Sequence, residues 1–157
     1  MKKEEKTNVM RLLEQKKISY DRHAYDPDST LTGAQIAEML GENPAAVYKT
    51  LVTEGKPGCH YVFVVPVQAE LNLKKAAAAA GEKSIHMILQ KELLPLTGYV
   101  HGGCSPIGMK KHFPTFIHQA ARDLPRMLVS AGKVGFQVEL APEDLLKTAE
   151  ASWADLV

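Results

Sequence analysis

Apolar and polar positions follow first a helical period and then a strand period through the first forty residues. Apolar residues three and four positions apart predict a helix over residues 7–17, and alternation over 18–22 predicts a strand. After a turn, Thr32 and Gln35 fit a capping box that opens a second helix. Gly41 suits the left-handed position just beyond the end of that helix.

The next segment has the pattern of two strands followed by a helix. Residues 47–53 and 61–67 are rich in β-branched and aromatic side chains, and the turn sequence EGKPGC lies between them. This arrangement predicts a hairpin with a loop longer than two residues. The alanine-rich run over 68–80 predicts a helix that packs closely on a sheet, and Gly81 ends it.

The second half of the chain continues as a mixture of strands and helices. We expect a short strand over 84–89, a helix near 90–94, strands over 115–119, 126–130 and 136–140, and a final helix from Pro142. Strands grouped in hairpins with helices between them favour a mixed α/β domain whose sheet is largely antiparallel. The pattern shows no repeat or linker, so we expect residues 1–157 to form a single domain.

Composition and charge narrow the possible functions. With 45% hydrophobic and 24% charged residues, the chain has the composition of an ordinary globular protein. Its 19 basic and 18 acidic residues give a formal net charge of +1, which excludes the strong general field of an independent nucleic-acid binder. Any contact with a polyanion must therefore be local.

The sequence indicates no membrane segment, disulfide, metal or cofactor. No apolar run approaches the roughly 20 residues of a membrane-spanning helix, and the amino terminus leads into no apolar signal core, so we expect a cytoplasmic protein unless a signal was removed. Cys59 and Cys104 lie in no zinc-binding spacing and are interpreted as free thiols. The histidines form no compact metal-ligand pattern, and no nucleotide-binding fingerprint is present.

Two features of the sequence could carry chemistry. The segment TGYVHGGCSPIGMKK contains Gly102 and Gly103, whose backbone N–H groups could bind an oxyanion, although a tight loop between strands explains the pair equally well. Lys49 lies in the otherwise apolar or β-branched run VYKTLV. Such a lysine either points into a cleft or protects an edge strand from aggregation.

Four segments in the same order resemble the YbaK/EbsC family of bacterial Cys-tRNA(Pro)/Cys-tRNA(Cys) deacylases, within the prolyl-tRNA synthetase editing-domain superfamily. They are VYKTLV, LNLKKAA, TGYVHGGCSPIGMKK and VSAGKVGFQVELAPEDLLK. The resemblance implies a compact domain with a twisted, barrel-like mixed sheet ringed by helices. It also implies a free-standing hydrolase that removes cysteine mischarged onto proline tRNA, with the tRNA acceptor end and prolyl-tRNA synthetase as partners.

The resemblance assigns catalytic positions to Lys49, Gly102 and Gly103. In the mechanism it suggests, the cysteinyl thiol of the substrate attacks its own ester carbonyl and releases a thiolactone. Lys49 would anchor the terminal nucleotide or polarise the ester, and the glycine loop would stabilise the oxyanion. Cys104 is not expected to be a nucleophile, because the family tolerates other residues at its position in GGxSP.

The resemblance also assigns the substrate pocket and the tRNA contacts. Tyr25, Thr50 and Ser130 match pocket positions, whereas Gln137 stands where several relatives carry an aspartate. Gln137 can hydrogen-bond a substrate amine or a ribose hydroxyl, but it supplies no negative charge. The candidates for phosphate contacts along the acceptor stem are Lys74, Lys75, Lys110, Lys111 and Lys133, which could equally form a solvated basic surface.

Two other functions remain open from the sequence. One is a deacylase of the same fold that removes another amino acid, such as alanine, with a bound water. The other is a non-catalytic module that binds tRNA or a synthetase and keeps Lys49 and the glycine loop only for shape. Turnover of a panel of mischarged tRNAs separates all three functions.

Overall fold

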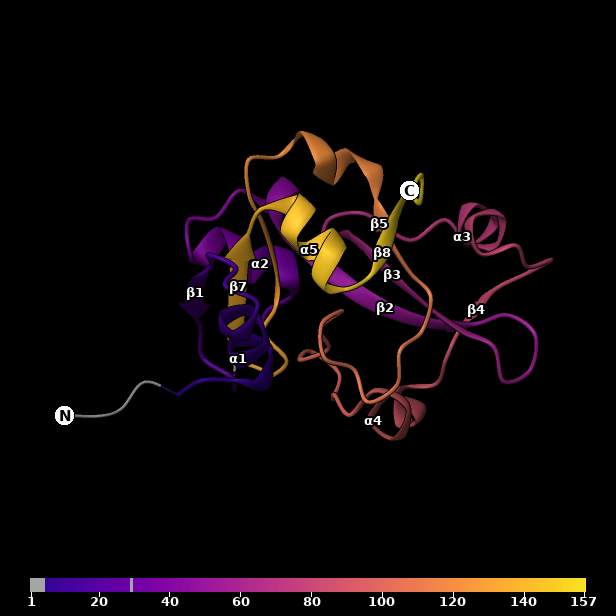
Figure 1. Ribbon diagram of the computed structural model, residues 1–157, viewed down its shortest axis with the longest axis horizontal. Helices are drawn as coiled ribbons and strands as arrows, with labels where there is room; N and C mark the ends of the chain where they lie inside the picture. Colours follow the sequence, from indigo (N-terminus) through magenta and orange to yellow (C-terminus); the bar gives the residue numbers. More distant parts are fainter. Residues whose placement is uncertain (1–4, 29) are drawn as a thin grey trace.

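The computed structural model describes residues 5–28 and 30–157, shown in Figure 1. The helices in this part of the chain are α1 (Asn8–Gln15), α2 (Gly33–Met39), α3 (Leu73–Ala80), α4 (Gln90–Thr97) and α5 (Pro142–Thr148), with the 3-10 turns η1 (Pro44–Ala46) and η2 (Gln119–Asp123). The strands are β1 (Asp21–Ala24), β2 (Tyr48–Glu54), β3 (His60–Pro66), β4 (His86–Met87), β5 (Thr115–His118), β6 (Met127–Ser130), β7 (Phe136–Leu140) and β8 (Ala151–Ala154).

Side-chain caps fix the starts of α1, α2 and α3. The predicted capping box is confirmed, because the Thr32 hydroxyl accepts from the backbone N–H of Gln35 and the Gln35 side chain accepts from that of Thr32. The helix expected over 68–80 begins later, at Leu73. The reason is that the side chain of Asn72 accepts hydrogen bonds from the first backbone N–H groups of α3 and so caps it.

The strands of the described residues form two sheets. The smaller has the order β1-β7-β6 and is antiparallel throughout; the larger has the order β4-β2-β3-β5-β8 and combines antiparallel with parallel pairs. A single parallel bridge between Val47 and Leu128 connects them. The predicted mixed, largely antiparallel α/β fold is confirmed. The barrel-like form is corrected, because β1 and β8 remain edge strands and two joined sheets do not close on themselves.

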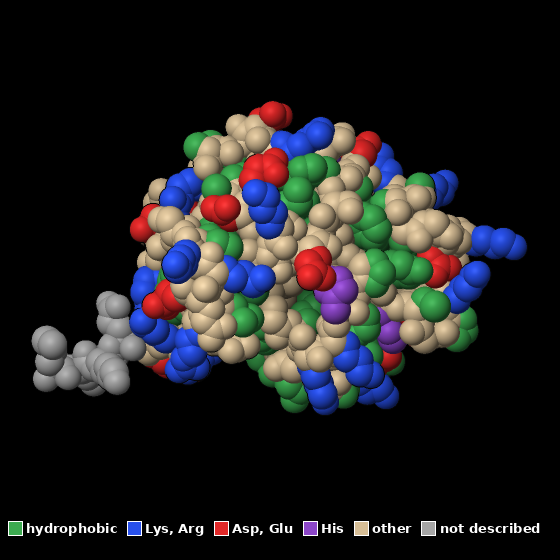
Figure 2. Space-filling view, in the orientation of Figure 1, with side chains coloured by type: hydrophobic (Ala, Val, Ile, Leu, Met, Phe, Trp, Pro, Cys, Tyr) green, Lys and Arg blue, Asp and Glu red, His purple; other side chains and the backbone are tan. Residues whose placement is uncertain are grey.

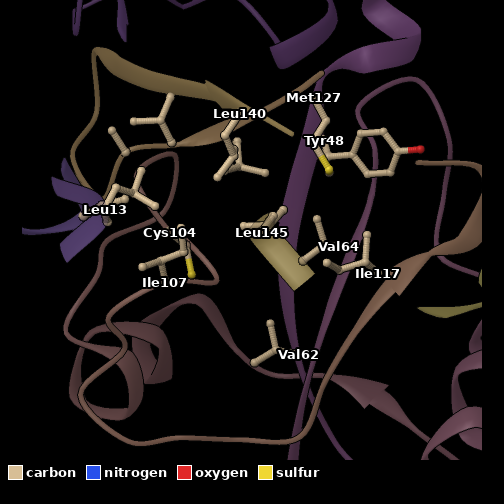
Figure 3. Packing of buried hydrophobic residues seen from close by; sticks show 14 of the residues in the cluster. Leu13, Tyr48, Val62, Val64, Cys104, Ile107, Ile117, Met127, Leu140 and Leu145 are labelled. Carbon is tan, nitrogen blue, oxygen red and sulfur yellow. The ribbon is translucent and has the colours of Figure 1, made fainter. Parts of the chain in front are cut away.

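The main hydrophobic core covers one face of both sheets. It receives side chains from α1, α5 and the glycine-rich segment, and Figure 3 shows Leu13, Ile107 and Leu145 in the same cluster as Val62 and Val64 of β3. Two smaller clusters cover the opposite face. In one, α3 packs on Phe63 and Val65; in the other, α2 and η1 pack on Val47 and Leu128.

One strand boundary and one whole strand differ from the sequence expectation. The strand expected over 18–22 forms instead at Asp21–Ala24, where its backbone pairs with β7. The terminal strand β8 was not predicted at all. It has four residues without a β-rich run, and its pairing with β5 is formed between segments far apart in the chain.

Candidate functional site

Lys49 lies on the sheet face opposite the main core. Side chains alternate along β2, so Lys49 shares a face with Val47 and Leu51. Val47 belongs to the cluster under α2 and η1, and Leu51 packs on the cluster under α3. Lys49 therefore occupies the strip of sheet between two helical covers. Its side chain is half-buried, and among residues 5–28 and 30–157 no hydrogen-bond or ion-pair partner of its ammonium group is found.

Strand pairing brings Ser130 and Gln137 onto the same face as Lys49. Ser130 lies directly opposite Gln137, and Gln137 lies directly opposite His23 of β1, so the three side chains point to one side of the smaller sheet. The bridge between Val47 and Leu128 aligns β2 with β6 in parallel. Two residues further along each strand are Lys49 and Ser130. The structure thus aligns four side chains from four strands in one row.

Tyr25 extends this row, whereas the side chain of Thr50 does not. The backbone N–H of Tyr25 donates to the carbonyl of Gly135 at 2.9 Å, which continues the pairing of β1 with β7 and places Tyr25 on the His23 face. Thr50 lies opposite Val64 in the hairpin and faces the main core. Its hydroxyl is buried and has no hydrogen-bond partner within the described residues. Only its backbone borders the row.

The glycine-rich segment packs against the turn that follows Ser130. A Cβ at position 103 would lie 2.9 Å from the backbone nitrogen of Val134, so two backbones approach here as only glycine permits. The N–H of Gly103 already donates to Val100 within the loop. Gly102, with φ of +86°, keeps an N–H that no hydrogen bond uses in the described part of the chain. Of the two predicted oxyanion donors, Gly102 is the free one.

The predicted tRNA-binding lysines differ in their ion pairing. Lys75 is paired with Asp155 at 3.0 Å and donates to the carbonyl of Val157, and Lys133 is paired with Glu5. The side chains of Lys74, Lys110 and Lys111 are exposed and have no such partner among the residues that the structure describes. Figure 2 shows basic and acidic side chains interspersed over the face in view, which agrees with the net charge of +1.

A small surface hollow of about 90 Å³ borders the glycine-rich segment. It is lined by Gly108, Lys111, His112 and neighbouring residues. Lys49, Ser130 and Gln137 do not line it. We therefore place the candidate site on the sheet face that carries Lys49, where predicted site residues from separate strands converge.

Three charged or titratable residues that the sequence analysis did not single out also lie on this face. Glu42, in the loop after α2, has a side chain only 6% exposed, and one of its carboxylate oxygens lies 3.8 Å from Nδ1 of His23. Nε2 of His23 lies 2.9 Å from a carboxylate oxygen of Glu139. One orientation of the Gln137 amide gives hydrogen-bonding partners to both its nitrogen and its oxygen. In this orientation Nε2 lies 2.7 Å and 3.2 Å from the two oxygens of Glu42.

Burial gives Glu42 an unusual protonation equilibrium. Loss of hydration raises the pKa of its carboxyl group above the ordinary 4.5, although His23 and the amide of Gln137 oppose this, and Glu139 adds to it. Because Glu42 follows a glycine in a polar segment, the sequence contains no signal that distinguishes it from a surface residue. The fold alone buries it.

We predict that Glu42→Gln changes the pH dependence of stability. The folded protein holds the proton of Glu42 more tightly than the unfolded chain, so this group favours folding below the ordinary pKa. That contribution is lost as the pH rises through the raised value. The variant lacks the titration. The free energy of unfolding of Glu42→Gln minus that of wild type should therefore increase from about pH 4 to about pH 7. Urea denaturation measures both values. An equal difference at both pH values would contradict the assignment.

Cys104 is placed as a core residue. Its side chain lies in the main hydrophobic cluster beside Ile107, as Figure 3 shows, and the residue is 8% exposed. Burial raises the pKa of its thiol to about 12. The thiol is therefore protonated at neutral pH and is a poor nucleophile.

We predict that Cys104→Ser retains most of the deacylase activity that the family resemblance implies. The replacement keeps the size of the side chain and leaves the backbone of the glycine-rich segment in place. The measurement is the initial rate on an aminoacyl-tRNA substrate, with circular dichroism to verify folding. A folded but inactive variant, or a covalent aminoacyl adduct on Cys104 detected by mass spectrometry, would restore the nucleophile hypothesis.

The described residues contain neither a membrane-spanning helix nor a cluster of metal-binding side chains. No helix in this part of the chain is long and apolar enough to cross a membrane. No group of three or more histidine, cysteine, aspartate or glutamate side chains in the same residues is arranged to hold a metal ion.

Comparison with known proteins identifies the family of this chain. Residues 28–148 match the family model described as an aminoacyl-tRNA editing domain. A protein of Enterococcus faecalis, provisionally named Cys-tRNA(Pro)/Cys-tRNA(Cys) deacylase EbsC, is 43% identical over 156 residues, which are 99% of this chain and 95% of that protein. A proline–tRNA ligase of Thermosipho melanesiensis is 31% identical over 90 residues, or 57% of this chain and 16% of the ligase.

A solved structure shares the fold over nearly the whole chain. It is provisionally described as a trans-editing enzyme for prolyl tRNA synthetase. It matches with a TM-score of 0.80 and 25% identity over 96% of this chain and 97% of that one. The resemblance noted in the sequence is confirmed, and this chain belongs to the aminoacyl-tRNA editing domain family.

Proposed function

We propose that this chain hydrolyses Cys-tRNA(Pro) in trans, as a protein separate from the enzyme that charged the tRNA. Its family membership makes it a hydrolase that acts on aminoacyl-tRNA. The cysteinyl substrate is proposed from the name of the Enterococcus faecalis relative. We further propose that residues 1–157 act as one editing domain in the cytoplasm, where tRNA is charged.

The observation that carries the proposal is the row of Lys49, Ser130 and Gln137, in which Ser130 leads into the turn that packs against the glycine-rich segment. An aminoacyl-tRNA end presents an anionic phosphate, an ester carbonyl and an α-ammonium group. A lysine with no partner in the described residues can bind the phosphate or polarise the carbonyl. Ser130 and Gln137 offer neutral hydrogen-bonding groups for the amino-acid part. The Ser130 hydroxyl accepts from the backbone N–H of Gly132, so its position is fixed by its own turn.

The proposed reaction needs no nucleophile from the protein. The sulfur of the bound cysteinyl group attacks its own ester carbonyl, the bond from that carbon to the ribose oxygen breaks, and the ribose oxygen takes up a proton. The thiolactone that forms is later hydrolysed by water. An intramolecular attack gains its rate from proximity, so the site has only to hold the chain bent. The N–H of Gly102 is the proposed donor to the oxyanion.

Recognition of the tRNA is proposed to rest on a few phosphate contacts and on a partner protein. The exposed lysines Lys74, Lys110 and Lys111 are the phosphate-binding candidates. Lys75 and Lys133 would first have to leave their ion pairs. So few contacts on a near-neutral protein give a modest, salt-dependent affinity with little sequence readout. We therefore propose prolyl-tRNA synthetase as the partner that delivers the tRNA.

Deacylation of one tRNA carrying three different amino acids tests this function. Purified protein is mixed with Cys-tRNA(Pro), Ala-tRNA(Pro) or Pro-tRNA(Pro), and loss of the ester is followed against buffer alone. We expect rapid loss of cysteine and little loss of alanine or proline. Preferential loss of alanine would identify the alternative deacylase, and the absence of turnover on every ester would identify a binding module.

A further inference from the structure

Glu42 and Gln137 form a buried pair at the edge of the candidate site. The side chain of Glu42 is only 6% exposed, and both of its carboxylate oxygens lie within hydrogen-bond distance of the Gln137 amide nitrogen. Gln137 is itself 7% exposed. Among the described residues, His23 of β1 and Glu139 of β7 are the other titratable groups that act on Glu42.

The carboxylate determines which way the amide points. An amide has a donor end and an acceptor end, whereas an ionised carboxylate only accepts. Nε2 of Gln137 must therefore face Glu42, and the opposite end of the amide, which faces only donors, must carry the oxygen. The charge at position 42 and the donors at the other end therefore select the same orientation of the amide.

We infer that Glu42 is a positioning residue that holds the Gln137 amide so that its oxygen accepts a hydrogen bond from the α-ammonium group of the aminoacyl ester. The inference rests on the proposed function, because it assigns a role within the same site. Gln137 lies next to Ser130 in the row that ends at Lys49. The buried negative charge behind the amide also polarises it, which strengthens its oxygen as an acceptor for a cation.

This arrangement gives a neutral residue at position 137 the effect of an acidic one. Gln137 contacts the substrate. The negative charge that favours an ammonium group belongs to Glu42, which accepts a hydrogen bond from the Gln137 amide. A purely structural role for Glu42 would predict that its removal affects all substrates alike. A role in ammonium recognition predicts an effect only on substrates that carry the ammonium group.

The experiment compares two esters that differ only in that group. Cys-tRNA(Pro) and 3-mercaptopropionyl-tRNA(Pro) both carry the thiol and the ester, but the second lacks the α-amino group. They are assayed at about pH 6.5, where an α-amino group holds its proton, with wild type, Glu42→Gln and the control Glu38→Gln. Glu38 is an exposed residue of α2, so the control removes the same charge from the surface.

We expect wild type and Glu38→Gln to prefer the cysteinyl ester at least tenfold in kcat/KM, mainly through KM, since a site built to bind a polar group discriminates against its absence. Glu42→Gln should reduce this preference to about twofold by losing activity on the cysteinyl ester alone. Gln137→Ala, which removes the amide and keeps the Glu42 charge, should reduce the preference equally. This variant also carries the test if Glu42→Gln does not fold.

Three results would overturn the inference. The first is an unchanged preference in folded Glu42→Gln, and the second is equal loss on both esters. The third is a preference that Glu42→Gln loses and Gln137→Ala keeps, because Glu42 would then not act through the amide. Failure of the proposed function looks different, since wild type would then cleave neither ester.

Discussion

Ser-tRNA(Pro) is expected to be cleaved at least a hundredfold more slowly than Cys-tRNA(Pro), although both esters should bind. Replacing sulfur by oxygen barely changes the shape of the side chain, but an alcohol is far less ionised and less nucleophilic than a thiol at neutral pH. The ratio corresponds to about 2.7 kcal/mol of barrier, more than a lost weak contact gives. Single-turnover rates measure cleavage of each ester, and competition binding measures its affinity.

The burial of Cys104 supports this prediction. Cys104, the cysteine nearest to the predicted oxyanion donors in sequence, is buried with a pKa of about 12 and is not available as a protein nucleophile. The proposed mechanism therefore uses the thiol of the substrate as the attacking group. Similar cleavage of the serine and cysteine esters, with no thiolactone trapped from the cysteine reaction, would point to an activated water instead.

Lys49→Ala is expected to lower deacylation at least tenfold, equivalent to ~1.4 kcal/mol of barrier, while the fold is retained. The lysine is half-buried on the strip of sheet between two helical covers, and its ammonium group has no partner among the described residues. A core role therefore does not explain its position. The measurement is the initial rate on Cys-tRNA(Pro), with urea denaturation to compare stability.

Lys56→Ala provides a matched control for this variant. Lys56 lies in the turn between β2 and β3, is exposed, and is removed from the Lys49 end of the hairpin. The control changes net charge by the same amount, so it should keep the wild-type rate. Near-normal turnover by folded Lys49→Ala would exclude the proposed role of this lysine.

Local signals in the sequence predicted local structure well. The capping box at Thr32 and Gln35 depends on contacts within one turn, and it forms as expected. The β2–β3 hairpin is likewise encoded by two β-rich runs and the turn between them. Pattern alone could not give the pairing of β5 with β8, because the two strands are far apart in the chain.

The site shows the same division between local and distant information. Lys49 stood out because a charge interrupts an apolar strand. Its alignment with Ser130 depends on the bridge between Val47 and Leu128, which no local pattern encodes. Glu42 is a stronger case, because it looks like a loop residue in the sequence and becomes a buried carboxylate only when α2 packs over the smaller sheet.

The most direct test of the account is a charging reaction in which prolyl-tRNA synthetase loads proline tRNA with cysteine or proline in the presence of this protein. We predict that the steady level of Cys-tRNA(Pro) falls as wild-type protein is added, that Pro-tRNA(Pro) is unchanged, and that Lys49→Ala has at least tenfold less effect. An unchanged level of Cys-tRNA(Pro), or an equal fall in Pro-tRNA(Pro), would contradict editing of cysteine in trans.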